Sequence, residues 1–211
     1  MHRAESSHRR REHEVEFSRI VAFSDGVFAI AITLLVLNLS IPEHLPGDDL
    51  TDALWDQRHD LFAYALSFAV IGRFWVIHHR LFGDVTGFDS RLLGVNLLYL
   101  SLIVLIPFSS QVLGDHGGET AAVVLYAANL ALVAVMGQIL FAHARRAGLL
   151  KTEPETYREG RRRSRLAAVV FTASIPVALV APHVAPLLWL ALVLDPVQRR
   201  ARAARHSGDA E

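Results

Sequence analysis

Four polar residues mark the first long apolar run of the sequence as more than a plain membrane anchor. Residues 20–39 are mostly Ile, Leu, Val, Ala and Phe, but Arg19 precedes the run, Ser24 and Asp25 lie near its start, and Thr33 lies further along it. An apolar run of this length can cross a bilayer as a helix. Polar groups inside a membrane are costly, so they usually pack on partners or line a pathway. These residues therefore indicate a polar joint between helices, an ion pathway, or both.

Helical spacing puts these groups on different faces of the expected helix. At 100° per residue, one stripe contains Ile30, Thr33, Leu34 and Leu37. Asp25 lies about 140° from Ile30, outside that stripe. Arg19 and Asp25 are also on different faces, so they cannot pair within the helix and each needs a partner on another helix. From composition alone, a face that contacts lipid or packs in a core is the preferred interpretation of the stripe.

A second polar group lies at the end of the next apolar run. Trp75, His78 and His79 are neighbours on a helix, and Arg73 lies in the same run. Neighbouring histidines can bind a metal, but the usual pattern of two histidines four apart with a carboxylate is missing. Histidine packing with hydrogen bonds is the preferred interpretation, and Asn96 in the third run is a plausible partner for Arg19, Asp25 or a histidine. No metal site and no cofactor is predicted, and with no cysteine in the chain a thiolate site is excluded.

Hydropathy predicts an all-α membrane protein with six spans. The expected spans are residues 20–39, 61–79, 92–112 and 120–144, followed by two short helices within residues 166–194. The last block contains two prolines on either side of His183, which interrupt a helix. We expect a tight turn there, and one long kinked helix is the alternative.

The charges predict which side of the membrane each loop faces. Arg and Lys gather in both tails, after the second span and after the fourth, whereas residues 40–60 carry six Asp or Glu against Arg58 alone. The positive-inside rule then places both termini in the cytoplasm and requires an even number of spans. We expect a multi-pass protein of the cell (plasma) membrane, with a six-helix transmembrane domain over residues 19–196 and basic, disordered tails over 1–18 and 197–211. The tails are interpreted as topology signals that contact the lipid bilayer, and no nucleic-acid partner is expected.

The first apolar run also carries a family signature. Arg19, Phe23, Ser24 and Asp25, running into GVFAIAITLLVL, resemble the signature of the transmembrane-protein-175 potassium channel family. The similarity continues through Ser67-Phe68, Trp75, His78-His79, Phe82, Asn96-Leu97-Leu98 and Pro107-Phe108. It covers residues 19–112 by motif and the remainder by topology.

The resemblance implies a homotetramer in which the first helix of each subunit lines a central pore. It assigns Ile30 to a constriction of bulky aliphatic side chains, Thr33 to a threonine layer linked to selectivity, and Leu37 to a further aliphatic ring. It also implies a polar network between the first three helices, formed by Arg19, Phe23, Ser24, Asp25, Trp75, His78, His79 and Asn96. Which of the two histidines makes the contact is left open.

The predicted function is therefore a leak channel that passes K⁺ in preference to Na⁺. A ring of Ile30 side chains strips water from the ion, and Thr33 hydroxyls replace part of the lost hydration. The alternative is a proton-coupled secondary transporter that uses Asp25 and His78, although no internal repeat typical of transporters is visible. A structural membrane protein is a further alternative. An enzyme is not predicted, because no set of nucleophile, base and orienting residue is found.

Overall fold

The computed structural model describes residues 2–39, 50–151, 154–182 and 184–193, and these residues are almost entirely helical. The elements are α1 (His2–Leu34), the 3₁₀ helix η1 (Leu35–Asn38), α2 (Leu50–Asp56), α3 (Arg58–Asp84), α4 (Ser90–Val104), α5 (Ile106–Asp115), α6 (Thr120–Arg146), α7 (Pro154–Val180) and α8 (Ala185–Val193). Over these ranges the only strand-like pairing is an isolated bridge between Val85 and Leu150. The all-α prediction is confirmed.

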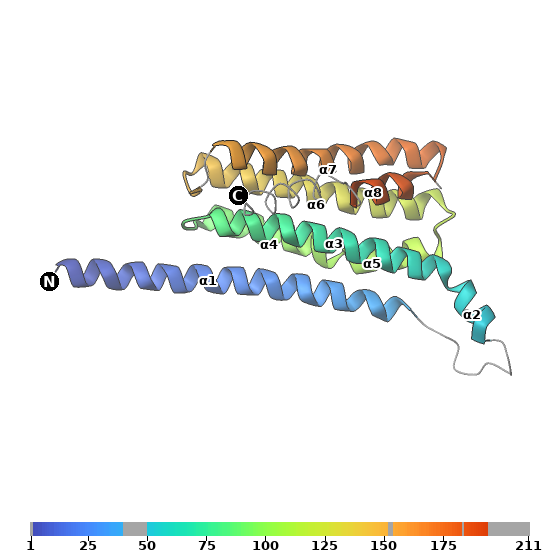
Figure 1. Ribbon diagram of the computed structural model, residues 1–211, viewed down its shortest axis with the longest axis horizontal. Helices are drawn as coiled ribbons and strands as arrows, with labels where there is room; N and C mark the ends of the chain where they lie inside the picture. The colour runs from blue at the N-terminus through green and yellow to red at the C-terminus, as the bar shows by residue number, and fades with distance from the viewer. Residues whose placement is uncertain (1, 40–49, 152–153, 183, 194–211) are drawn as a thin grey trace, which may run out of the picture.

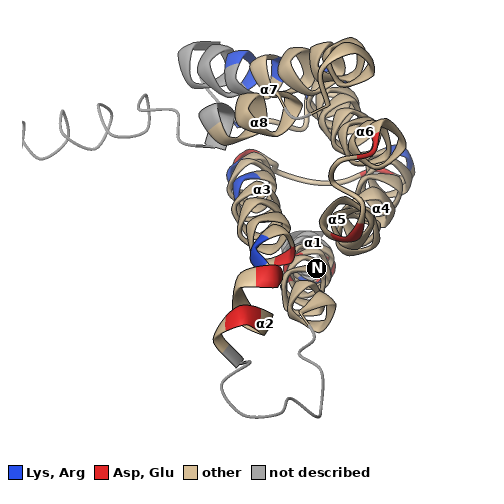
Figure 2. Cartoon of the chain, turned by 90° about the vertical axis from the view of Figure 1, so that its right-hand side faces the viewer, with Lys and Arg blue, Asp and Glu red and all other residues tan. Residues whose placement is uncertain are grey.

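The long helices run side by side along the long axis of the molecule (Figure 1). Helix α1 packs on α3, α4 and α5, and α6 and α7 pack against each other on the opposite side of the bundle. The loops at one end are acidic: Figure 2 shows Asp and Glu on α2 and at the adjoining ends of α5 and α6. The opposite end holds the close of α6 and the start of α7, with Arg145, Arg146, Arg161 and Arg162. The segregation of charge along the sequence is thus a segregation between the two ends of the bundle.

Four helical segments are long and apolar enough to span a membrane. They are Val15–Asn38, Arg58–Asp84, Ser90–Asp115 and Thr120–Arg146, and each matches one of the first four expected spans. The fifth expected span corresponds to the shorter apolar part of α7, Ser164–Val180. The sixth corresponds to α8, which has 9 residues within the described range.

A break between Val180 and Ala185 separates two helices in place of one long kinked helix, and the first of them, α7, has 27 residues rather than being short. Helix α7 ends at Val180, and α8 begins at Ala185 and packs back against α7. A proline lacks the amide hydrogen that a continuous helix needs, so the two prolines here favour the break. His183, between them, lies outside the described residues.

Two features of the helices bear on the sequence expectation. Helix α1 begins at His2, inside the segment 1–18 that was expected to be a disordered tail, and the disorder of that tail stays a prediction. Arg and Glu, which are frequent there, are strong helix formers and can continue a helix that has already been nucleated. The third span is divided at Leu105, because Pro107 in the first turn of α5 has no amide hydrogen for the preceding turn. The expected tail at 197–211 lies outside the described residues.

The core is built by side chains from several helices. One cluster contains Phe28 and Leu35 of α1 and η1, Ile71 of α3 and Leu130 of α6, all fully buried. A second cluster lies at the basic end of the bundle, around Phe82, Leu92 and Leu140. Lipid is as apolar as these side chains, so close packing rather than escape from water holds such helices together.

Candidate functional site

Helix α1 has one face covered by the rest of the chain and one face left uncovered. Its buried residues within the described part are Ser24, Phe28 and Ala31, and Leu35 of η1 continues the same helical face. The most apolar stretch of α1 is only 22% buried, against 39%, 44% and 50% for the other three spanning segments. Of the four, α1 therefore has the largest share of its surface free to meet another molecule.

The stripe expected to face a pore lies on this uncovered face. Ile30 is 59% exposed, Leu37 is 72% exposed, and Thr33 is exposed as well. The Thr33 hydroxyl donates to the carbonyl oxygen of Ile30 at 2.8 Å. Because that bond uses the hydroxyl hydrogen, the lone pairs of Thr33 Oγ1 remain available as acceptors on the uncovered side.

A chain of hydrogen bonds joins α1, α3 and α4. His78 Nε2 and Asn96 Oδ1 are 2.8 Å apart, and the Asn96 amide donates to Ser24 Oγ at 3.0 Å. The Ser24 hydroxyl in turn donates to the carbonyl oxygen of Ile20 at 2.9 Å. Since Asn96 Oδ1 can only accept, His78 Nε2 must carry a hydrogen. The donors therefore all point the same way, from α3 through α4 to α1.

Aromatic rings enclose His78. Its ring stacks on Phe82 at 4.3 Å and on Tyr99 at 5.5 Å between centroids, and Phe28 of α1 lies at 5.4 Å. His78, Ser24 and Asn96 are all buried. A buried chain of hydrogen bonds that crosses three helices fixes the register of the helices that carry it.

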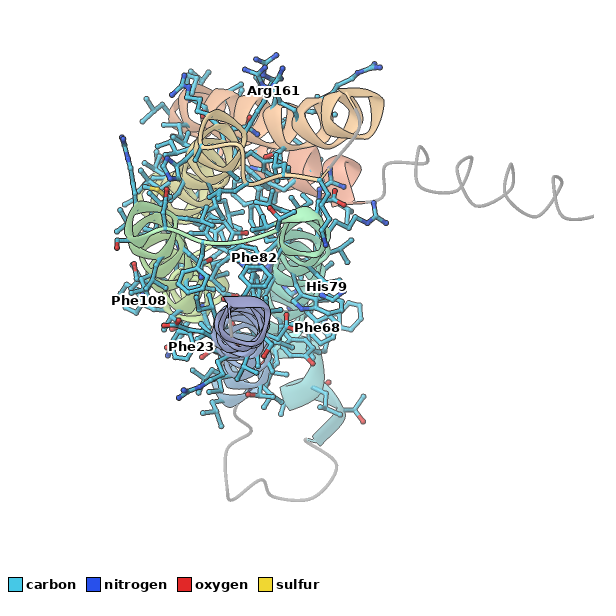
Figure 3. The ribbon with its side chains drawn as sticks, turned by 90° about the vertical axis from the view of Figure 1, so that its left-hand side faces the viewer. Phe23, Phe68, His79, Phe82, Phe108 and Arg161 are labelled. Carbon is cyan, nitrogen blue, oxygen red and sulfur yellow. The ribbon has the colours of Figure 1, made fainter. Side chains whose placement is uncertain are left out.

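A second, more exposed contact links α1 and α3. The Trp75 indole Nε1 donates to Asp25 Oδ1 at 2.9 Å. His79 does not enter the buried chain; its ring stands 5.3 Å from that of Trp75. Figure 3 shows Phe82 beside α1, and Phe23 and His79 on opposite sides of α1. The structure thus separates the two histidines, with His78 inside the joint and His79 at its edge.

Arg19 and Phe23 are not brought into this network. Both are exposed on α1, and Arg19 forms no hydrogen bond or ion pair with a described residue. Sequence reasoning grouped Arg19 with Asp25, but the hydrogen bond to Asp25 Oδ1 comes from Trp75 of α3 and not from Arg19.

The structure adds a second polar chain, toward the acidic end, that sequence reasoning did not propose. The Ser67 hydroxyl donates to Ser110 Oγ at 2.7 Å and lies 2.9 Å from the Tyr126 hydroxyl, and Ser110 donates to the carbonyl oxygen of Ala63 at 3.2 Å. Since Ser67 has a single hydrogen, the Tyr126 hydroxyl is the donor to Ser67. Ser67 belongs to the motif Ser67-Phe68, and polar residues inside apolar helices are expected to find partners. The sequence therefore indicated that Ser67 would be hydrogen-bonded, but not to which residues.

Metal binding finds no support in the part of the chain that the structure describes, where no three His, Asp or Glu side chains gather in a group that could hold an ion. His78 and His79 contact different partners, as above. What the geometry offers is a membrane helix fastened on one side by hydrogen bonds and presenting aliphatic and hydroxyl groups on the other.

Comparison with known proteins gives a consistent result. A family model described as the endosomal/lysosomal potassium channel TMEM175 matches residues 19–107. A potassium channel of Streptomyces collinus is 38% identical over 139 residues, which cover 64% of this chain and 68% of the relative. A potassium channel of Chamaesiphon minutus is 38% identical over 134 residues, which cover 61% of this chain and 66% of the relative.

The fold also matches a solved structure. The crystal structure of a lysosomal potassium-selective channel TMEM175 homologue from Chamaesiphon minutus superposes with a TM-score of 0.78 at 29% sequence identity. The match covers 88% of this chain and 98% of that chain. The structural similarity therefore extends well beyond residues 19–107, into the part of the sequence where motifs are weak.

Proposed function

The chain belongs to the family of the endosomal/lysosomal potassium channel TMEM175, and we propose that it is itself a potassium channel in which the α1 helices of four subunits surround a central pore. The names of its bacterial relatives, which are potassium channels, support K⁺ as the ion that it conducts. The pore arrangement is our inference from the surface of α1.

The uncovered face of α1 is the observation that carries this proposal. Ile30, Thr33 and Leu37 face away from the chain's own core, on the least buried of the four spanning segments. In a tetramer, four such faces turned inward give stacked rings of isoleucine, threonine and leucine. The buried polar chain through Ser24, on the opposite face, would hold α1 in the rotation that this requires.

Selectivity in this proposal comes from dehydration at an apolar ring. Four Ile30 side chains form a narrow constriction that a hydrated ion crosses only by losing water. K⁺ loses water at lower cost than Na⁺ and passes more readily. The Thr33 oxygens lie one turn further along and have free lone pairs, so they can coordinate the ion and replace part of its lost hydration.

The membrane orientation follows from the charges at the two ends of the bundle. We propose six spans, completed by α7 and α8, with the arginine-rich end and both termini in the cytoplasm of a cell whose plasma membrane holds the protein. The acidic end, with Asp52, Asp56 and Glu119, then faces outward and raises the local cation concentration.

A proton-coupled transporter that relays protons between Asp25 and His78 is less well supported. Asp25 bonds to Trp75, whereas His78 bonds to Asn96 and is enclosed by aromatic rings. Neither bond leads from one titratable group to the other. The Asp25–Trp75 contact and the His78 chain each join α1 to its neighbours, and the two are not connected into a proton relay.

Flux through the purified protein in liposomes tests the proposal. A potassium channel gives passive current that reverses at the K⁺ equilibrium potential, whether or not a pH gradient is imposed. Current that follows an imposed pH gradient with K⁺ at equal concentrations would favour the transporter. Cross-linking of the same preparation to a four-subunit species tests the assembly separately.

A further inference from the structure

A cleft of ≈ 700 Å³ lies between α4, α6 and α7 at the basic end of the bundle. None of its described lining residues belongs to α1, so it is separate from the proposed pore face. Figure 3 looks at the molecule from this end and labels Arg161 on α7. The proposed channel function makes no use of this cleft.

Four arginines from three helices line the cleft. Arg91 comes from α4, Arg146 from the last turn of α6, and Arg161 and Arg165 from α7, where their spacing of four places them on one face. No described lining residue is Asp or Glu. The fifth basic residue, His143, is held by Asp89 at 2.9 Å, so the arginines supply the positive charge. Guanidinium groups suit phosphate because they donate two parallel hydrogen bonds.

The other part of the cleft is apolar and follows α6 away from the charged end. Val135, Ile139 and Ala142 lie on the same face of α6 as Arg146 and line the cleft with it. From Val135 to Arg146 the helix rises by about 16 Å. Val95 of α4 adds to the apolar wall. The cleft thus changes along its length from guanidinium groups to aliphatic side chains that run toward the membrane interior.

Gln138 adds a hydrogen-bond donor between these two parts. Its Nε2 atom is buried and has no hydrogen-bond partner among the described residues, and the side chain lines the cleft. It lies two turns before Arg146, about 12 Å along the helix. A buried donor without an acceptor is unfavourable by about 1–3 kcal/mol, so an acceptor placed there by a ligand would be stabilising.

From these features we propose that the cleft binds one anionic phospholipid. The phosphate lies among the four arginines, an ester carbonyl accepts from Gln138, and an acyl chain follows Val135 and Ile139. A soluble phosphate compound would use the arginines but leave the apolar wall and the buried amide without a partner. The apolar wall lies on α6, a helix long enough to span the membrane, so an acyl chain can reach it from the bilayer. A phospholipid is therefore the occupant that fits both parts of the cleft.

Thermal unfolding of the purified full chain in a neutral detergent tests this site. Dioleoylphosphatidylglycerol is added to one sample and dioleoylphosphatidylcholine to another, both at about ten times the dissociation constant of the anionic lipid. At this concentration the anionic lipid should raise the midpoint of thermal unfolding by about 3–6 °C, and the zwitterionic lipid should raise it by less. Arg161→Gln and Arg165→Gln should each reduce the shift to less than half.

Arg162→Gln is the matched control, because it removes the same charge from the neighbouring position, which is exposed and not part of the lining. It should keep the full shift. Loss of the shift in Arg162→Gln as well, or equal shifts with both lipids, would overturn the site. Inorganic phosphate alone giving the full shift would replace the lipid with a soluble anion and also contradict the proposal. Should one of the two cleft variants fail to fold, the other carries the same comparison.

Discussion

Asn96 and His78 meet through one directed hydrogen bond, with Oδ1 of Asn96 2.8 Å from Nε2 of His78. The same amide group donates from its nitrogen to Ser24 Oγ at 3.0 Å. Asn96 is therefore the middle member of the buried chain, and α4 is connected through it to both α1 and α3. Loss of this one side chain breaks two interhelical hydrogen bonds and leaves His78 and Ser24 each without the interhelical hydrogen bond that the structure gives it.

Replacing Asn96 by alanine should destabilise the folded subunit by about 1–2 kcal/mol, the range that model peptides show for interhelical hydrogen bonds in membranes. A double-mutant cycle with Ser24→Ala isolates the Asn96–Ser24 bond, because the two residues are in direct contact. Unfolding of the detergent-solubilised protein measures each step. Strictly additive effects of the two substitutions would show that the bond contributes nothing.

Asp89 gives a prediction about pH. The backbone N–H of Leu92, together with His143, lowers the pKa of the Asp89 carboxyl below its usual value of 3.8. Because the pKa is lower in the folded state, the charge contributes stability above pH 3.8, and this contribution is lost as the pH falls through the lower folded-state pKa.

Asp89→Asn tests that contribution, since asparagine still caps the start of α4 but carries no charge. The wild-type protein should unfold at a higher temperature than the variant at neutral pH, and the difference should shrink at about pH 3. The effect should be modest, because the carboxylate is partly exposed to solvent. A difference that stays constant over this range would mean that the charge of Asp89 is not what stabilises the contact with His143.

Arg19→Ala should weaken assembly rather than the fold of one subunit. Arg19 is exposed on α1, and in the proposed tetramer we expect it to contact a neighbouring subunit. Size-exclusion chromatography after cross-linking should show fewer tetramers at unchanged helix content. Arg162→Ala, also an exposed arginine, is the control and should assemble normally. Normal assembly of Arg19→Ala would remove Arg19 from any polar joint.

The extent to which the sequence predicts this molecule depends on the range of the interactions involved. The spanning segments were predictable because about 20 apolar residues in succession have few other uses. That Ile30, Thr33 and Leu37 share one face follows from helical geometry alone, but that this face is uncovered depends on where the other helices pack. The partner of Asp25 does not, because Trp75 lies fifty residues away in sequence, and a helical wheel describes only one helix. The same applies to the choice between His78 and His79, which depends on where α4 places Asn96.

Thr33→Val should reduce the preference for K⁺ while leaving the pore assembled. Valine has nearly the same shape as threonine but lacks the oxygen whose lone pairs lie on the uncovered face. Thr33→Ser keeps that oxygen and should stay close to the wild-type protein in selectivity. Reversal potentials under mixed K⁺ and Na⁺ measure the permeability ratio. Equal ratios in the valine and serine variants would show that the Thr33 hydroxyl does not contact the ion.

Ile30→Asn should have the largest effect on permeation of any single change on α1. The amide attracts water into the constriction, so ions keep more of their hydration shell as they pass it. We expect a several-fold higher conductance and a K⁺/Na⁺ permeability ratio that falls toward unity, both measured in planar bilayers. Val36→Asn is the matched control: Val36 is 51% exposed on the same segment, but it lies about 120° around the helix from Ile30. It should leave the ratio unchanged. If the two variants behaved alike, the constriction would have to lie on another face of α1, and the proposed rotation of the helix in the tetramer would be wrong.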